Sequence, residues 1–422
     1  MLKRLLKYNV LIIVINLIIS TFLFSVRSPY NLTVLGGIRM VGSQDRLPII
    51  LIDTLKEELK INFIRTGFFY DLSYIPDSIK KIIKNPDKTP GDIAILYDHP
   101  WFVNAIPANS MPNSLIRMAY STLESTAIPQ EWVHIFNTHF DAVIVPDEFI
   151  KNVYYNSGVR IPLFVIPEGM YLDDLLEMPL KSKKGYPFVF GCSAAFWPRK
   201  NQELLLEAFF QEFGNSPHVR LRLHGKDAHD YYIKALKNKV KQYNLSNVEI
   251  IYKGFKPQEY TDFLNSLDCY VLLSKGEGFS LTPREALALG LPCILSNNTA
   301  HTSICNTNLV IAVSSTVKEP YFDANLSLKG AIGYIFNCTV LDVCKALREV
   351  YEHYEYHLEK NAKRREWARQ YLYKSLKSVY LTLFAPKKVE LGENDLICGN
   401  TLITTSSSLY DKYLNLILLN KP

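Results

Sequence analysis

The chain has 422 residues, which is enough for two domains of ordinary size, each with its own hydrophobic core. Hydrophobic residues make up 48% of it and charged residues 21%, a composition that excludes a disordered chain. The formal net charge of +6 suits an anionic ligand or membrane surface, whereas no stripe of basic residues interleaved with aromatics indicates nucleic acid as a partner.

A basic and then strongly apolar segment opens the sequence. Lys3, Arg4 and Lys7 precede residues 8–26, which carry no charge and are rich in Ile and Leu. A run of this length is close to what spans a bilayer, so residues 1–27 are predicted to be a membrane anchor. A helix lying in the membrane plane and a buried first element of the next domain are the alternatives.

The side of the membrane depends on the type of cell. The excess of basic residues before the apolar segment favours a cytoplasmic N-terminus, and a single span would then place the rest of the chain outside the cytoplasm. An in-plane helix would keep the protein on the cytoplasmic face of a bacterial membrane. In a eukaryote, a Golgi or endoplasmic reticulum anchor would place it in the lumen.

Alternating strand-like and helix-like segments occupy residues 28–180. Residues 31–37 are predicted to be a strand that ends in a tight Gly-Gly turn, and residues 43–59 the helix that follows. Short apolar runs typical of buried strands recur further along, and the alternation predicts an α/β domain. These further expected strands are 61–64, 92–97 and 141–146.

A second α/β domain is predicted over residues 186–376, after a polar linker at residues 181–185. Apolar residues at helical spacing predict a helix after Asn201, and residues 347–376 are expected to be helical. The tail from residue 377 to 422 has no clear assignment and could pack back on the first domain. Strands are expected at 187–192, 219–223, 248–252, 270–273 and 293–296.

The stretch between the last two of these strands has the clearest helix start and stop signals in the chain. A loop at residues 275–280 leads into a helix that Thr282 could cap, with Pro283 at its first position and Gly290 after its end. Strand, loop, helix and strand form a βαβ unit, whose loop lies at the carboxyl edge of the sheet. Open α/β sheets bind their ligands at that edge.

Two carboxylates, Glu277 and Glu285, flank the start of this helix. The backbone N–H groups of residues 278–281 should point outward there, where free donors and the helix dipole favour an anion. Glu285 has an alternative role, because Thr282 and Glu285 have the spacing of a capping box. For Glu277 the alternative is a solvated loop charge, although polar loop residues often carry function.

The sequence from Glu277 to Pro292, E-G-F-S-L-T-P-R-E-A-L-A-L-G-L-P, resembles the E-x7-E segment of retaining glycosyltransferases of the group 1, or family 4, type. Ser280 stands where glycine is usual. The resemblance implies a GT-B fold, in which two Rossmann-like domains face each other across a cleft that holds a nucleotide-sugar donor. The implied acceptor is a glycan, a lipid-linked molecule or a protein.

The resemblance also implies roles on the donor side. Lys200 matches a lysine that contacts the donor diphosphate. A second basic residue usually stands just after the preceding strand, but this chain has Cys192 and Ser193 there, so Arg199 is the candidate replacement. Glu277 would orient the transferred sugar, and Glu285 would hold the ribose.

Further candidates lie in the first domain. Gly36 and Gly37 match the family's first β–α turn, where backbone approaches the donor phosphate or the acceptor, although a plain turn would explain them too. His99 follows an expected strand, and Glu124 lies in an E-S-T-x-I-P run similar to that of a subgroup of the superfamily. Both are candidates for the acceptor side, and a strand-end histidine that is merely hydrogen-bonded is the alternative for His99.

The implied mechanism rests on charge. The donor-binding amides of Gly278, Phe279, Ser280 and Leu281, together with Lys200, would stabilise the departing diphosphate. The resemblance implies retention of configuration without an obligatory metal or other cofactor. The departing phosphate would itself take the acceptor's proton, so no dedicated base is required.

Seven cysteines at irregular spacing include no C-x-x-C pair, and several lie in apolar runs, so they are expected to be reduced core residues without a metal. Two alternatives to a transferase stay open at this point. One is another GT-B chemistry, such as epimerisation of nucleotide sugars or phosphorolysis. The other is a non-catalytic protein that binds nucleotide sugars.

Overall fold

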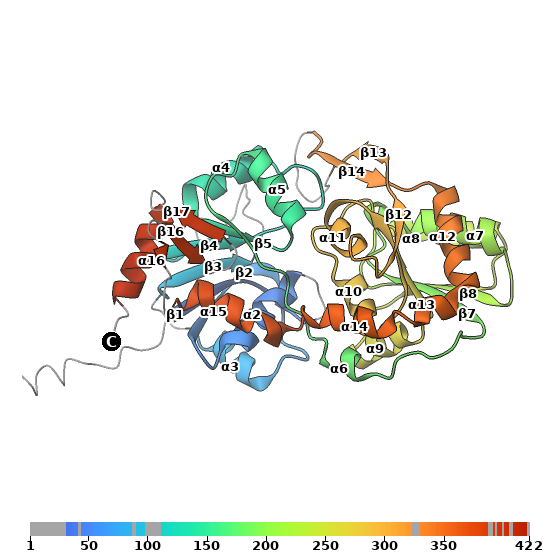
Figure 1. The fold of residues 1–422 in the computed structure, drawn as a ribbon, viewed down its shortest axis with the longest axis horizontal. Coiled ribbons are helices and arrows are strands. Elements are labelled where there is room, and N and C mark those ends of the chain that lie inside the picture. The colour runs from blue at the N-terminus through green and yellow to red at the C-terminus, as the bar shows by residue number, and fades with distance from the viewer. Residues whose placement is uncertain are drawn as a thin grey trace, which may run out of the picture.

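The computed structural model describes residues 31–40, 44–86, 90–97, 111–322, 330–386, 391–392, 395–398, 401–404 and 408–419. Within these residues the chain forms two α/β lobes side by side, each built on one six-stranded sheet (Figure 1). We call them the N-lobe and the C-lobe. Residues 1–30, which contain the predicted membrane segment, and His99 lie outside the described residues.

The N-lobe sheet is parallel throughout, with the strand order β2-β1-β3-β4-β5-β6. β3 and β5 are buried along their whole length, which explains why they are continuous apolar runs in the sequence. The strands are β1 (Asn31–Arg39), β2 (Lys60–Asp71), β3 (Ile93–Tyr97), β4 (Ile116–Tyr120), β5 (Ala142–Val145) and β6 (Leu163–Val165). The helices are η1 (Gln44–Arg46), α2 (Leu47–Leu55), α3 (Asp77–Lys84), α4 (Gln130–His139) and α5 (Glu148–Ser157).

The C-lobe sheet is also parallel, with the order β12-β11-β10-β7-β8-β9. Its strands are β7 (Phe188–Ser193), β8 (Val219–Gly225), β9 (Val248–Tyr252), β10 (Cys269–Leu272), β11 (Cys293–Asn297) and β12 (Ile311–Ser314). The helices up to β11 are η2 (Pro198–Lys200), α7 (Gln202–Phe213), α8 (Asp230–Gln242), α9 (Pro257–Asn265) and α10 (Leu281–Ala288). Those after it are η3 (Thr299–His301), α11 (Thr302–Cys305), α12 (Val340–Glu352), α13 (Tyr354–Leu358) and α14 (Asn361–Arg369).

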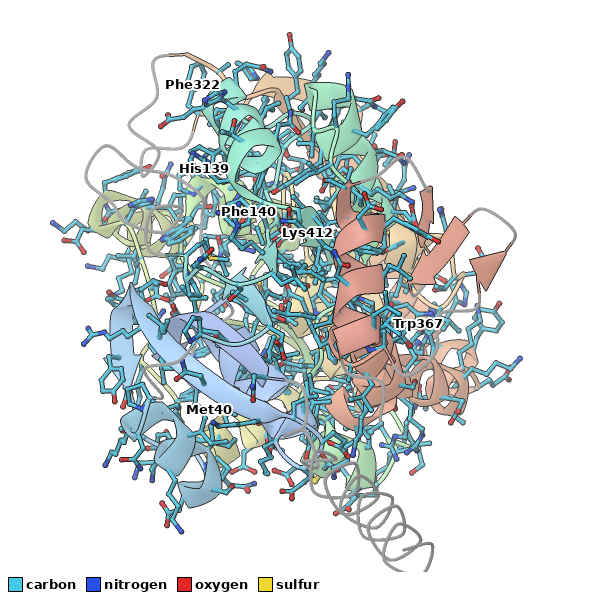
Figure 2. All side chains as sticks on the ribbon, turned by 90° about the vertical axis from the view of Figure 1, so that its left-hand side faces the viewer. Met40, His139, Phe140, Phe322, Trp367 and Lys412 are labelled. Atoms are coloured by element: carbon cyan, nitrogen blue, oxygen red, sulfur yellow. The ribbon has the colours of Figure 1, made fainter. Side chains whose placement is uncertain are left out.

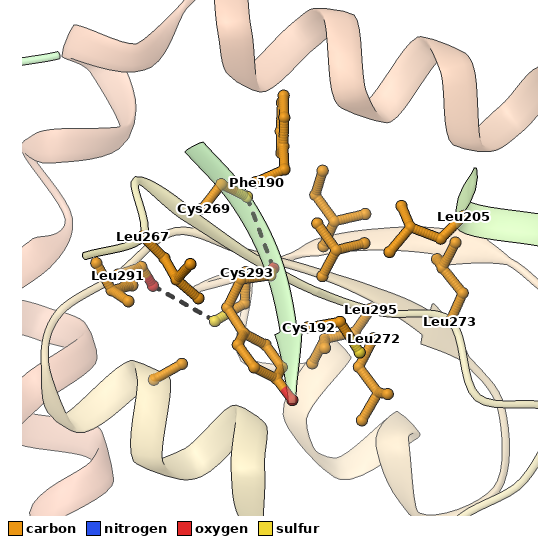
Figure 3. Packing of buried hydrophobic residues seen from close by; sticks show 14 of the residues in the cluster. Phe190, Cys192, Leu205, Leu267, Cys269, Leu272, Leu273, Leu291, Cys293 and Leu295 are labelled. Carbon is orange, nitrogen blue, oxygen red and sulfur yellow. Dashed lines mark hydrogen bonds between the residues drawn. The ribbon is translucent and has the colours of Figure 1, made fainter. Parts of the chain in front are cut away.

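The core of the C-lobe contains several of the cysteines. Cys192 of β7, Cys269 of β10 and Cys293 of β11 are buried among leucines of the C-lobe core (Figure 3). They are free thiols, as are the other cysteines whose side chains the structure describes. The prediction of reduced core cysteines is therefore confirmed for these residues. The helix expected after Asn201 is confirmed as α7, which buries Leu205, Ala208 and Phe209.

The chain crosses between the lobes twice. It leaves the N-lobe through α6 (Asp173–Glu177) and returns through η5 (Tyr373–Leu376), and backbone hydrogen bonds join the two crossings. Met170 N–H donates to the Tyr371 carbonyl over 2.8 Å, and Tyr373 N–H to the Met170 carbonyl over 3.0 Å. The region predicted to be helical at 347–376 is thus three separate helices followed by a crossing.

The C-terminal segment belongs to the N-lobe. Tyr380, Leu383, Tyr413 and Leu416 lie in the N-lobe core with residues of β1, β3 and α2. They come from α15 (Lys377–Phe384) and α16 (Ser408–Leu419), between which a small antiparallel sheet is formed by β15 (Leu391–Gly392), β16 (Asp395–Cys398) and β17 (Thr401–Thr404). Lys412 of α16 links this helix to the N-lobe, with Nζ 2.7 Å from a carboxylate oxygen of Asp141 (Figure 2).

A hairpin that the sequence did not predict fastens the C-lobe to the N-lobe. It consists of β13 (Val317–Pro320) and β14 (Tyr334–Asn337). Thr126 N–H donates to the Tyr334 carbonyl over 3.1 Å, and Tyr334 N–H donates to the Thr126 hydroxyl over 2.9 Å. Tyr321, Ile332 and Ile335 also pack into an N-lobe cluster with Trp132. Because this contact is apolar as well as hydrogen-bonded, it holds the lobes together beside the loop that follows β10.

No helix within the described ranges is long and apolar enough to cross a membrane.

Candidate active site

The site is built on the turn between β10 and α10, at the carboxyl edge of the C-lobe sheet. The turn passes through Ser280, whose φ of 70° lies in the left-handed region that favours glycine. The hydroxyl of Ser280 donates to Nε2 of His301 over 2.8 Å, which holds the residue in this conformation. The helix begins at Leu281, so the prediction that Thr282 caps it and Pro283 opens it is wrong. Thr282 instead accepts a hydrogen bond from the Tyr270 hydroxyl over 2.7 Å.

Arg284 holds the turn from behind. Its side chain is fully buried, lies over the Phe279 ring at 3.7 Å, and donates to the carbonyls of Phe279 and Ser280. With these carbonyls held on the Arg284 side, the amide hydrogens of Gly278, Phe279 and Ser280 have no acceptor among the described residues. Free amides at a helix start favour an anion, so this geometry is compatible with the predicted anion site.

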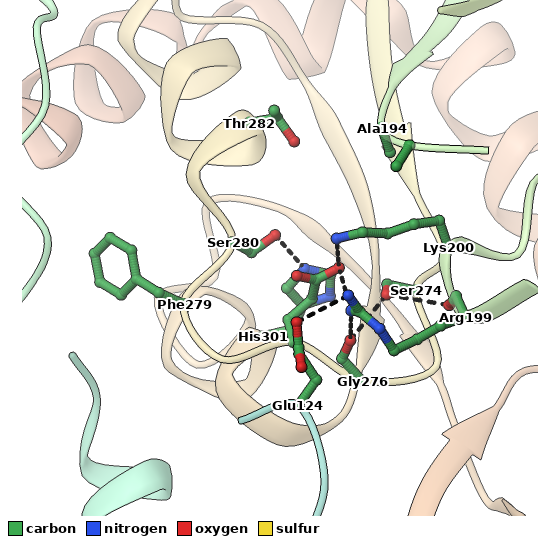
Figure 4. Close-up of polar contacts among 12 residues, drawn as sticks. Glu124, Ala194, Arg199, Lys200, Ser274, Gly276, Phe279, Ser280, Thr282 and His301 are labelled. Atoms are coloured by element: carbon green, nitrogen blue, oxygen red, sulfur yellow. Dashed lines mark hydrogen bonds and ion pairs between the residues drawn. The ribbon is translucent and has the colours of Figure 1, made fainter. Parts of the chain in front are cut away.

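At the first end of this turn Glu277 forms an ion pair with Lys200, whose side chain extends toward Ser280 and His301 (Figure 4). Lys200 Nζ is 2.5 Å from Glu277 Oε1, and an Arg199 nitrogen is 3.5 Å from the same oxygen. Burial works to raise the pKa of Glu277, but Lys200 and Arg199 outweigh it and hold that pKa at about 2. Burial lowers the pKa of Lys200, and Glu277 opposes that shift. Glu277 is therefore a buried carboxylate rather than a solvated loop charge.

Arg199 and Glu124 join the lobes at the same point. Arg199 donates to Glu124 Oε1 over 2.9 Å and to the Gly276 carbonyl over 2.6 Å. A Cβ on Gly276 would lie 2.1 Å from the Glu124 carbonyl oxygen, and a Cβ on Gly278 would lie 2.1 Å from the Thr122 hydroxyl. The two glycines thus permit the N-lobe loop to pack directly on the turn.

Glu285 lies at the other end of the turn and does not form the capping box. Its Oε2 accepts a hydrogen bond from the Tyr260 hydroxyl over 2.6 Å. Its Oε1 is 3.3 Å from both terminal nitrogens of Arg46, which belongs to the N-lobe. The capping alternative for Glu285 is excluded, because the carboxylate points to Tyr260 and Arg46 rather than to the backbone at Thr282.

Gly36 and Gly37 do not form the predicted turn. Both lie inside β1, which continues to Arg39 with a shift of register against β2. A Cβ on Gly36 would lie 2.9 Å from a side-chain atom of Pro48, and one on Gly37 would lie 2.5 Å from Asp45. Glycine is needed here because η1 and α2 pack closely against the strand, and not because the chain reverses.

Sequence reasoning missed His301, which is fully buried beneath the turn. Nδ1 lies 3.1 Å from the Ser296 carbonyl, so this nitrogen carries the hydrogen and Nε2 accepts from Ser280. Burial lowers the pKa of His301 to about 4, against the opposing pull of Glu277. A neutral histidine at this place supports the turn, and no short motif around it signals that role.

Glu168 was also missed. This residue follows β6, is 7% exposed, and its carboxyl group has no hydrogen-bond partner among the described residues. Burial raises the pKa of Glu168 to about 7, although Arg46 and Arg284 are close enough to lower it. The carboxyl group therefore changes charge near neutral pH at the junction of the lobes.

Glu168 leads to a pH-dependent prediction. Its pKa in the folded state is raised above the ordinary 4.5, so the unfolded state loses its proton first as the pH rises. The free energy of unfolding is therefore highest below pH 4.5 and falls as the pH rises through about 7. The loss is on the order of 3 kcal/mol, from about 1.4 kcal/mol per unit of pKa. The melting temperature of Glu168→Gln relative to the wild type should thus increase by several degrees between pH 5 and pH 8. The exposed Glu131→Gln serves as control, and an equal difference at both pH values would contradict the prediction.

No group of three or more His, Cys, Asp or Glu side chains in the described part of the chain is arranged to hold a metal ion.

Comparison with known proteins supports the resemblance drawn from the motif. Residues 187–320 match the model of the family Glycosyl transferases group 1, so the resemblance is confirmed for this segment. No curated protein matches the chain.

Solved structures match over a much larger part of the chain. Anabaena HepE in complex with UDP and glucose is 13% identical, with a TM-score of 0.57 over 84% of this chain and 99% of that one. WaaG, a glycosyltransferase involved in lipopolysaccharide biosynthesis, is 11% identical, with a TM-score of 0.58 over 84% of this chain and 100% of that one. The likeness shows the fold, a GT-B-like pair of α/β lobes with parallel sheets, as the resemblance implied.

Proposed function

We propose that this protein is a glycosyltransferase that moves a sugar from a nucleoside-diphosphate sugar to an acceptor hydroxyl, with retention of configuration at the sugar. The observation that carries the proposal is the 278–281 turn. Its free amides lie between two buried carboxylates, Glu277 and Glu285, and Lys200 contacts the first of them. A diphosphate between two sugar rings needs such an order of groups: donors in the middle and hydroxyl acceptors on either side.

The charges support distinct roles for the two ends of the turn. Breaking the bond between the sugar carbon and the diphosphate leaves a dianion, which the turn amides and Lys200 would stabilise as it forms. Glu277 is ionised at neutral pH, since its pKa is about 2, so it accepts hydrogen bonds from the transferred sugar and cannot act as an acid. Glu285 would accept hydrogen bonds from the ribose.

The departing diphosphate would take the proton of the acceptor hydroxyl as the new bond between the acceptor oxygen and the sugar carbon forms. His301 does not compete for that role, because its Nε2 is occupied by Ser280 and its pKa is about 4. Glu124 remains a residue for the acceptor side, where it would orient a hydroxyl group while paired with Arg199. His99 is the other acceptor-side candidate.

The donor is tested by a screen of nucleoside-diphosphate sugars for thermal stabilisation, with UDP-glucose first, because HepE has been solved in complex with it. The best binder is then incubated with glycan, lipid-linked and protein acceptors, with and without EDTA. We expect transfer in both conditions and a product with the anomeric configuration of the donor. Epimerised donor without transfer, or binding without any reaction, would favour the epimerase-like or non-catalytic alternative.

Membrane association through residues 8–26 is part of the proposal, on the evidence of the sequence alone. It predicts that the full chain sediments with lipid vesicles and that a chain starting at Ser28 does not. Binding of both chains would place the lipid contact elsewhere.

A further inference from the structure

Three cationic side chains gather where the lobes meet, on the Glu285 side of the turn. Arg39 and Arg46 come from the N-lobe, at the end of β1 and in η1, and Lys226 comes from the C-lobe turn after β8. We call them the cationic cluster. Arg39 forms an ion pair with Asp45 over 3.1 Å, and Arg46 pairs with Glu285. Each side chain of the cluster is at least three-quarters buried.

The cluster carries like charges in a partly desolvated place. Burial lowers the pKa of Lys226, and both Arg39 and Arg46 lower it further, while Asp227 and Asp45 oppose the shift. Each cation has one carboxylate nearby, at 3.8 Å for Lys226 and Asp227, and an anionic ligand would further offset the repulsion between the cations. Cationic side chains held together in this way indicate a site for a negatively charged ligand.

A second cation for a diphosphate is missing from the place where sequence reasoning expected it. Arg199 already donates to Glu124 and to the Gly276 carbonyl, and its guanidinium lies 3.5 Å from Glu277. Burial raises the pKa of the Cys192 thiol to about 12, so that residue is neutral. Besides Lys200, the negative charge of a diphosphate therefore needs a second cation, which neither Arg199 nor the end of β7 provides.

Arg46 is suited to that role because its present contacts are weak. Both of its terminal nitrogens approach the same oxygen of Glu285 at 3.3 Å, instead of forming two parallel bonds to the two oxygens. The second carboxylate oxygen of Glu285 accepts a hydrogen bond from the Tyr260 hydroxyl. Nε of Arg46 is buried and has no partner in the described part of the chain. A ligand that bound to the Glu285 carboxylate would leave the N–H donors of Arg46 free to bind another acceptor.

We propose that Arg46 binds the diphosphate of the donor: the ribose hydroxyls take its place on Glu285, and the guanidinium turns to the phosphate oxygens. Arg39 and Lys226 add positive charge beside it. This inference rests on the proposed function and extends it, because it assigns a donor contact to the N-lobe. Donor binding would then add a further contact between the two lobes through the phosphate.

The test measures the affinity of the full chain for uridine, UMP and UDP by calorimetry, or for the matching guanosine series if the screen returns a guanine donor. Arg46→Gln should weaken UDP binding by about 10- to 100-fold, the usual effect of losing hydrogen bonds to a charged group. Its affinity for uridine should stay equal or rise, because Glu285 becomes available to the ribose. Arg46→Lys keeps the charge but not the paired N–H donors of the guanidinium, so its affinity for UDP should lie between those of the wild type and Arg46→Gln.

Arg220→Gln is the matched control, because Arg220 is exposed on β8 and the substitution removes the same charge. It should leave all three affinities unchanged. If Arg46→Gln weakens uridine and UDP by the same factor, or leaves UDP binding at the wild-type level, the phosphate contact is refuted while the proposed function stands. If the wild-type protein binds no nucleotide, both fall together.

Discussion

Replacing Glu277 with glutamine is expected to lower the turnover number by about a hundred- to a thousandfold, the range found when one preorganised group at a reacting centre is removed. The amide cannot stabilise the positive charge that develops on the sugar, and it cannot accept hydrogen bonds from the hydroxyls as a carboxylate does. Steady-state kinetics with the donor identified by screening measures the effect. Nucleotide binding should persist, because the diphosphate gives Lys200 an anionic partner.

The substitution also has a structural cost, which has to be measured beside the kinetics. Lys200 is buried and loses its counter-ion in the ligand-free variant, which costs several kcal/mol in other buried ion pairs. The melting temperature should therefore fall, and it should recover in part when nucleotide is added. Glu249→Gln is the control, since it breaks an exposed ion pair with Arg222 at 2.7 Å far from the turn. A Glu277→Gln enzyme that turns over at the wild-type rate would refute the role of Glu277.

Replacing Gly276 with alanine is expected to reduce turnover by about a hundredfold, because it displaces groups of the site without removing any of them. The new Cβ would lie 2.1 Å from the backbone oxygen of Glu124 and 2.9 Å from Ile335, so the loop or the turn has to move. That movement pulls Arg199 away from Glu124 and shifts Glu277, which follows Gly276. The strain should also lower the free energy of unfolding by about 1–3 kcal/mol.

The comparison for this variant is Gly254→Ala, because a Cβ on Gly254 meets no atom within 4 Å. It should keep both the melting temperature and the turnover number of the wild type. Equal turnover in the two alanine variants would show that the lobes do not need to touch at Gly276. Thermal unfolding and steady-state kinetics on the same preparations make the comparison.

The central βαβ unit could be predicted from the sequence because its signals are local. Apolar runs mark β10 and β11, and the glycine and proline near residue 290 mark the end of the helix. The start of α10 was missed by two residues because Ser280, and not a glycine, takes the left-handed conformation. The Gly36-Gly37 pair was misread for a related reason, since glycine serves close packing as well as turns.

The contacts between lobes could not be predicted, because they join residues far apart in the chain. Arg46 and Glu285 are 239 positions apart, and neither has a neighbour in sequence that signals the other. The β13–β14 hairpin consists of strands of four residues, too short to show a period. Glu168 and His301 are defined by what surrounds them in space, and burial of a single polar residue leaves no mark in the sequence.

Because the C-terminal segment returns to the N-lobe, the two lobes are expected to fold in a fixed order during synthesis on the ribosome. The C-lobe is one uninterrupted stretch from β7 to α14, so it can fold as soon as that stretch has emerged. The N-lobe has to wait for Tyr413 and Leu416, which fill its interior from the far end of the polypeptide. A shortened product that stops after η5 would therefore keep a folded C-lobe and lose the half that was synthesised first.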